Sequence, residues 1–214
     1  MTEADNGISL PLNGHPRFNR GLSGHDVRHQ LSVSGTWALP SPAHGAARLV
    51  FRGWQMALIA VYSSGVPFSA RLGYDAARTL TTRPDFRSGQ RPDLAPGASP
   101  NPVTGDPNRW IDPSAFRRPQ IGFLGNLGRN TIIGPDLATV DFSLVRRFRP
   151  ASLGEQGALE LRLEAFNLLN RANFNLPAPE RMEIFGAASS REDVGRITSA
   201  GYAREIQFGL KLRF

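Results

Sequence analysis

The chain has 214 residues, a formal net charge of +7, 22 glycines, 17 prolines and no cysteine, a composition that suits strands and irregular loops better than packed helices. The absence of cysteine excludes disulfide frameworks, thiolate metal sites and thiol nucleophiles. Arginine supplies almost all of the positive charge, since Lys211 is the only lysine, and the arginines are dispersed, whereas a nucleic-acid interface concentrates them on one face or segment.

The first two predicted strands cover residues 27–39 and 53–63. In the first, apolar residues and Gly35 alternate with serine and threonine, which gives one apolar face and one hydroxylated face. In the second, the alternate residues from Trp54 to Tyr62 are apolar, but Ile59 and Val61 lie on the opposite face, so burial on both faces remains an alternative. The apolar run 56–62 is far shorter than the roughly 20 residues that a membrane-spanning helix needs.

Three further strands are predicted over residues 137–149, 157–171 and 203–214. Each alternates apolar residues with polar or charged ones, although Arg146 interrupts the apolar face of the first and the alternation loosens from Phe166 to Asn170 in the second. A helix would scatter these charges around its axis. The pattern therefore predicts an all-β chain with about five long strands.

The connections between these strands alternate between short and long. Residues 40–52 and 150–156 form short links, whereas 64–136 and 172–202 are long, rich in proline, glycine, asparagine and arginine, and without a sustained period. Structureless loops of that length are unusual in a compact soluble domain. They are typical of outer-membrane β-barrels, whose periplasmic turns are short and whose outer loops are long. The sequence thus predicts that 64–136 and 172–202 are outer loops.

Side chains fit this assignment of sides and faces. Aromatic residues gather at the two interfaces of membrane barrels, and those expected there are, at the end with short links, Trp37, Trp54, Phe148 and Phe214, and at the other end, Tyr62 and Tyr202. Polar residues at the alternate strand positions are expected to face the lumen: Asp141, Arg147, Glu160, Arg162, Glu164, Glu205, Gln207 and Lys211. For these charges, pairing across neighbouring strands is favoured over contact with a substrate.

A strand can cross hydrocarbon only as part of a closed sheet, because each backbone N–H and C=O needs a protein partner there. About five strands are too few to close, since the smallest such barrels use about 8. The first residues also lack the basic and apolar regions of a signal peptide. We therefore expect the chain to be a fragment, or its sheet to be completed by other chains.

Several segments together resemble one family in their order and spacing. They are His25–Gln30, Gly53–Gln55, Ser64–Phe68, Asn130 with Gly134–Pro135, Asp141–Leu144 followed by Arg147–Phe148, Arg162–Asn170 with Asn173–Phe174, and Ala203–Phe214. The resemblance is to the C-terminal β-barrel of TonB-dependent receptors, most strongly to the Oar-like group, whose N-terminus carries a carboxypeptidase-regulatory-like domain. It spans nearly the whole chain, although no single motif is specific.

The resemblance implies an antiparallel transmembrane β-barrel of roughly 22 strands with a plugged lumen, of which this chain supplies the last strands. Its implied location is the outer membrane of a Gram-negative bacterium, and its implied partners are membrane lipid, the remaining strands and plug, the barrel-assembly machinery and, through the missing N-terminal part, the TonB complex. The assembly machinery is expected to recognise the last strand at Phe208, Leu210, Leu212 and Phe214. This fragment alone is not expected to transport a substrate, and no cofactor is implied.

The main alternative is a soluble β-sandwich or adhesin-like binding module, in which the apolar faces would pack on each other. An enzyme is not expected, because no catalytic constellation occurs. His25, Asp26 and His29 have a spacing that suggests a metal site, but on a strand residues i and i+4 are about 13 Å apart, so polar loop residues are the favoured interpretation. Asn167 and Asn170 are expected to end a strand more than to contact a ligand, since asparagine favours turns.

Overall fold

A computed structural model of the chain describes residues 18–42, 44–79, 90–150, 157–186 and 192–213. Phe214, predicted as an interface and assembly residue, lies outside them. The chain divides into two compact units. The first contains the residues up to Arg28 together with Ser64–Asp136 and Phe174–Ala200, and the second contains His29–Ser63, Leu137–Asn173 and Gly201–Phe214. We refer to them as the loop unit and the sheet unit.

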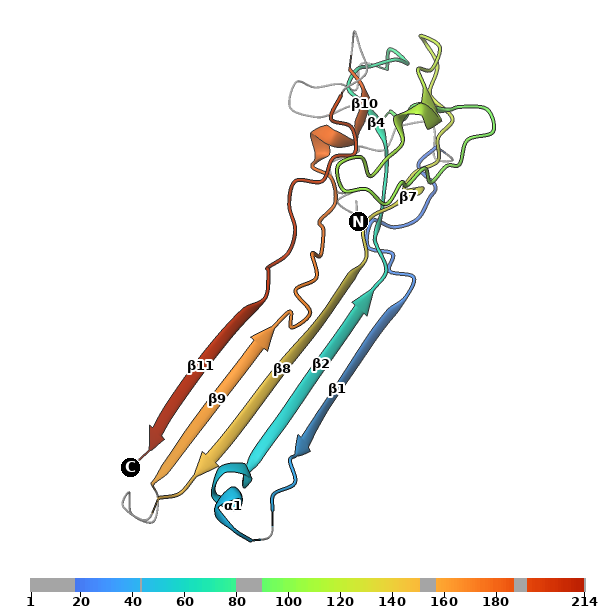
Figure 1. The fold of residues 1–214 in the computed structure, drawn as a ribbon. Helices are drawn as coiled ribbons and strands as arrows, with labels where there is room; N and C mark the ends of the chain where they lie inside the picture. Colours follow the sequence, from blue (N-terminus) through green and yellow to red (C-terminus); the bar gives the residue numbers. More distant parts are fainter. Residues whose placement is uncertain (1–17, 43, 80–89, 151–156, 187–191, 214) are drawn as a thin grey trace. The chain divides into compact units, whose positions relative to one another are not determined.

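The sheet unit is a 5-stranded antiparallel sheet with the order β1-β2-β8-β9-β11, in which each long strand lies beside the next one along the chain (Figure 1). Its strands are β1 (Gln30–Ala38), β2 (Trp54–Ser63), β8 (Leu137–Phe148), β9 (Ala158–Phe166) and β11 (Glu205–Arg213). All of them lie within the ranges predicted from period-two patterning. This up-and-down order follows from antiparallel pairing of neighbours, which needs no crossover.

The observed strands and links differ from the predicted ones in two places. β9 ends at Phe166 and not near residue 171, because Asn167 adopts a left-handed backbone with φ 48° and leaves the ladder. The link 40–52 contains the short helix α1 (Ala46–Phe51), for which no element had been predicted. No helix in the described ranges combines the length and hydropathy needed to cross a membrane.

The loop unit corrects the prediction that the long connections lack structure. Residues from both connections form small two-stranded ladders: β3 (Pro67–Phe68) with β7 (Ile132–Ile133), β4 (Arg71–Leu72) with β10 (Glu183–Phe185), and β5 (Asp93–Leu94) with β6 (Phe116–Arg117). Two 3₁₀ turns, η1 (Pro113–Ala115) and η3 (Pro179–Met182), accompany them. Phe68, Leu72, Ile111, Ile132 and Ile184 are fully or almost fully buried in a shared core. The β4–β10 ladder joins segments about 110 positions apart in sequence, which explains why local patterning did not reveal it.

Buried polar groups hold the loop unit together as well. Asn130, at φ 51°, donates from Nδ2 to the carbonyl oxygen of Leu22 (2.8 Å) and from its backbone N–H to Ser69 Oγ (2.8 Å). The Arg91 guanidinium stacks on the Phe18 ring at 3.7 Å from its centroid and donates from Nε to the Leu127 carbonyl oxygen (2.8 Å). These bonds tie the residues before Arg28 to the long connection, and satisfied buried polar groups of this kind favour one defined arrangement.

We predict that Leu72→Ala loosens the loop unit. Leu72 is fully buried, and a leucine-to-alanine change in a packed core costs about 2–5 kcal/mol of the free energy of unfolding. Hydrogen–deuterium exchange should therefore accelerate at the amides of residues 64–79 and 90–136. Ile121→Ala, an exposed position of the same unit, is the matched control and should change stability by no more than about 0.5 kcal/mol. Unchanged exchange in Leu72→Ala would show that these segments share no cooperative core.

Candidate functional site

The sheet separates apolar and polar residues onto its two faces. Cα pairing aligns Trp37, Met56, Leu144, Leu163 and Phe208 in one row across all the strands. The adjacent row, which is one residue away along each strand, consists of Thr36, Ala57, Ser143, Glu164 and Gln207. Because side chains alternate between faces along a strand, the first row belongs to a continuous apolar face and the second to a largely polar one.

The apolar face is not covered by a second layer among the described residues. Trp37 is 49% exposed and Phe208 is 83% exposed, and Leu31, Val33, Leu210 and Leu212 are exposed with them. In a β-sandwich the corresponding face packs against another sheet. An exposed apolar face of this extent marks a surface that another apolar phase or partner covers. The sandwich alternative therefore has no support in the packing of this sheet.

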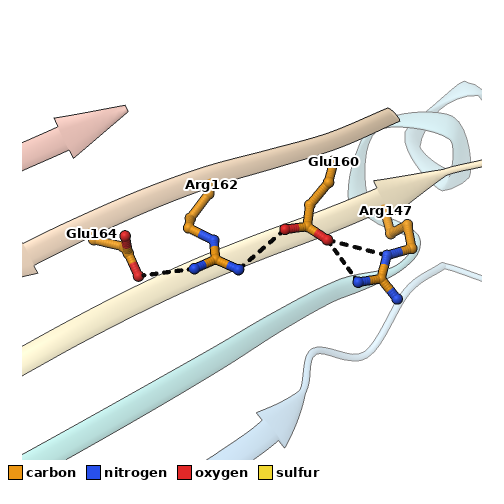
Figure 2. Close-up of polar contacts among 4 residues, drawn as sticks. All are labelled: Arg147, Glu160, Arg162 and Glu164. Carbon is orange, nitrogen blue, oxygen red and sulfur yellow. Dashed lines mark hydrogen bonds and ion pairs between the residues drawn. The ribbon is translucent and has the colours of Figure 1, made fainter. Parts of the chain in front are cut away.

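The polar face carries a chain of ion pairs on β8 and β9 (Figure 2). Glu160 Oε2 accepts from Arg147 Nη2 at 2.6 Å, and its Oε1 accepts from Arg162 Nη2 at 3.1 Å. Arg162 Nη1 continues the chain to Glu164 Oε1 at 3.5 Å. Arg147 lies opposite Glu160 on the neighbouring strand, so the closest pair links β8 to β9. This arrangement agrees with the expected pairing of charges across strands.

Pairing places every predicted lumen residue on this polar face. The residues that share it are Asp141, Arg147, Glu160, Arg162, Glu164, Glu205, Gln207 and Lys211. The face is not uniformly polar, since Ile59, Val61 and Val145 lie on it too. That it borders a lumen stays a prediction.

An asparagine cluster closes one end of the polar face. Asn167 is buried; its backbone N–H donates to Asp141 Oδ1 (2.9 Å), and its Nδ2 donates to the carbonyl oxygens of Arg171 (2.9 Å) and Tyr202 (3.1 Å). Asn173 Oδ1 accepts from the backbone N–H of Ala138 (2.9 Å). Asn167 thus ends β9 and fixes the entry to β11, which agrees with the expected turn role. These bonds use its amide group, so it is not available to a ligand.

Beside this cluster lies an open cavity of about 490 Å³. Its polar lining includes Thr139, Asp141, Glu205 and Gln207, and its apolar lining includes Phe166 and Tyr202. Asp141, Glu205 and Gln207 were predicted to face the lumen, but the sequence did not show that they line one cavity. The order of β8, β9 and β11 in the sheet brings the ends of β8 and β11 to that cavity. The described part of the chain includes His25, Asp26 and His29. In that part, no group of three or more His, Asp or Glu side chains could hold a metal ion.

The predicted interface aromatics lie at the two ends of the strands. Trp37, Trp54 and Phe148 are on the apolar face at the end that carries α1, and Tyr62 is on the same face at the opposite end. Tyr202 precedes β11 at that opposite end and is strongly exposed. Aromatic side chains thus lie near both ends of the strands, as in the interfacial belts of membrane barrels.

Comparison with protein families gives a match to the outer membrane beta barrel domain over residues 2–207. The chain belongs to this family. No curated protein and no solved structure gave a significant match. Membership places this barrel domain in an outer membrane. In such barrels apolar side chains at alternate positions meet lipid and the polar ones face the interior, so we predict that the apolar face of this sheet meets lipid.

Cysteine labelling tests this assignment, because the chain has no native cysteine. Gln207→Cys and Phe208→Cys are neighbours on opposite faces of β11. In the complete barrel that contains this chain, embedded in lipid vesicles, a charged, water-soluble maleimide should modify Gln207→Cys readily and Phe208→Cys much more slowly. The pair Ser32→Cys and Val33→Cys on β1 repeats the comparison. Equal rates within both pairs would contradict a lipid-facing apolar side.

We predict that Asn167→Ala destabilises the sheet by about 3 kcal/mol, because the carbonyl groups of Arg171 and Tyr202 lose their donor and alanine is strained in the left-handed region. Asn167→Gly loses the same hydrogen bonds but adopts a positive φ freely, so it should recover about 1 kcal/mol of this loss. Denaturant unfolding of the complete barrel in lipid measures both variants. Equal losses for the two would show that the backbone conformation contributes nothing at this turn.

Proposed function

We propose that this chain is the C-terminal part of the β-barrel of an Oar-like TonB-dependent receptor, which imports a substrate across the outer membrane of a Gram-negative bacterium. The observation that carries the proposal is the sheet itself, whose strands alternate lipid-compatible and polar residues in register while short and long connections alternate between them. The order and spacing of the segments that resemble this receptor family add to the support.

In this proposal the chain has no catalytic role. β8, β9 and β11 supply part of the barrel wall, and the ion pairs from Arg147 to Glu164 line its interior, where they stiffen the wall and meet a plug domain contributed by residues outside this chain. The cavity lined by Asp141 and Gln207 offers hydrogen-bonding groups at the rim of that interior.

The loop unit is the proposed site of first contact with substrate. Its core of buried side chains means that its surface is largely preformed, and a preformed surface avoids the entropic cost of ordering a loop on binding. The partners in this proposal are membrane lipid, the remaining strands and plug, the barrel-assembly machinery acting on the last strand, and the TonB complex acting through a plug-bearing segment.

The experiment that tests the proposal measures uptake in cells. A strain carrying the full-length gene should import one of a panel of labelled iron chelates, vitamins, oligosaccharides or peptides, and disruption of either this gene or tonB should abolish that import. The protein should remain in the outer-membrane fraction in the tonB strain, which controls for loss of assembly. Import that persists without TonB would exclude a TonB-dependent transporter while leaving the barrel assignment intact.

A further inference from the structure

Five arginines gather at the end of the sheet that carries α1. Arg48, Arg52, Arg146, Arg147 and Arg149, with Gly53, Phe148 and Pro150, line an open cavity of about 840 Å³. They come from α1, from the residue that follows it and from the last positions of β8 and the link after it. We call this set the arginine cluster. No carboxylate lies among the described residues that line the cavity.

In the described part of the chain, the arginines that line this cavity outnumber the carboxylates that reach them. Glu160 accepts from Arg147, but the same carboxylate also accepts from Arg162, so it offsets little of the cluster's charge. Arg48, Arg52, Arg147 and Arg149 are exposed. Like charges held close together raise the free energy of the protein unless an anion is present, and guanidinium groups match phosphate oxygens with paired hydrogen bonds.

The cluster is also joined to the apolar face. Arg146 is buried on that face; its Nη1 donates to the carbonyl oxygen of Val50 (2.6 Å), and its guanidinium lies 4.1 Å from the centroid of the Phe148 ring. Trp54 Nε1 donates to the same carbonyl oxygen at 2.9 Å. The end of α1 is therefore fixed against β2 and β8 by two donors from the lipid-facing side.

Apolar residues of α1 remain exposed beside these charges. Val50 is 57% exposed and Phe51 is 54% exposed, directly between Arg48 and Arg52 in the chain. Exposed apolar side chains next to arginines are unfavourable in water but suit the boundary between headgroups and acyl chains, where the apolar part enters the membrane and the cations meet anionic lipid. An acidic protein segment would satisfy the arginines but would not need these apolar residues.

We propose that the arginine cluster binds the phosphate of an anionic phospholipid headgroup, while Val50 and Phe51 contact the upper part of its acyl chains. Arg48, Arg52 and Arg149 hold the headgroup, and Arg146 keeps α1 in place beneath it. The inference needs only a barrel in a lipid bilayer and does not depend on TonB or on any transported substrate. It goes beyond the proposed function, because it assigns a lipid site to the end of the sheet that carries α1.

Quenching of Trp54 by brominated lipid tests the proposal. Trp54 lies next to the cluster, and replacing every other tryptophan of the complete barrel with phenylalanine, Trp37 and Trp110 among them, leaves it as the reporter. The protein is placed in phosphatidylcholine vesicles that contain an equal mole fraction of brominated phosphatidylglycerol or brominated phosphatidylcholine. We expect phosphatidylglycerol to associate with the site about fivefold more strongly than phosphatidylcholine, and therefore to quench Trp54 more. This factor corresponds to the contribution of a single arginine near an anionic surface.

The variant Arg48→Gln, Arg52→Gln, Arg149→Gln should lose this preference. Arg20→Gln, Arg117→Gln, Arg196→Gln removes the same charge from exposed positions of the loop unit and should keep it. Equal quenching by the two lipids in the parent protein would overturn the proposal, and it is the result expected if an acidic protein segment occupied the cluster. A preference that survives the triple substitution in the cluster would overturn it as well. The comparison of the two lipids in the parent protein involves no arginine substitution, so it does not depend on whether the arginine variants fold.

Discussion

The structure depends on one constraint: in hydrocarbon, every backbone N–H and C=O must be bonded within the protein. The long strands satisfy one another's backbone hydrogen-bonding groups, since β2, β8 and β9 are each paired on both sides. In the described part of the chain, β1 pairs with β2 alone and β11 with β9 alone. Closing this sheet into a barrel would need further strands at both edges, from the same chain or from others, because such barrels use about 8 or more.

The same constraint explains how the two faces differ. A one-residue slip would move Glu164 and Gln207 to the apolar face and Leu163 and Phe208 to the polar face, so the alternation fixes the register strongly. Arg146 is the exception on the apolar side, and it is accommodated at a strand end by the Val50 carbonyl oxygen and the Phe148 ring. Asn167 marks where the regular pattern stops, because its side chain replaces ladder bonds with bonds to Arg171 and Tyr202.

The long connections follow different physics from the strands. Their core joins Leu72 on β4 to Phe185 on β10, and it buries Ile111 and Ile132 from the segment between. Such contacts depend on side chains far apart in sequence, so neither period two nor period 3.6 is visible locally. This is why sequence analysis predicted irregular loops where the chain forms a packed unit. The functional consequence is a defined surface, which suits recognition better than a collection of mobile loops.

The sequence by itself determined the parts of this protein that rest on local alternation: the positions of the five long strands, their apolar and polar faces, and the aromatic residues at the strand ends. These are readable because each side chain's face follows from its place in the strand. The tertiary structure alone decided the packing of the loop unit, the end of β9 at Asn167, the convergence of Asp141 with Gln207, and the gathering of arginines from α1 and β8. Each of these needs strands or loops that are distant along the chain to be brought together, and no local pattern encodes that proximity.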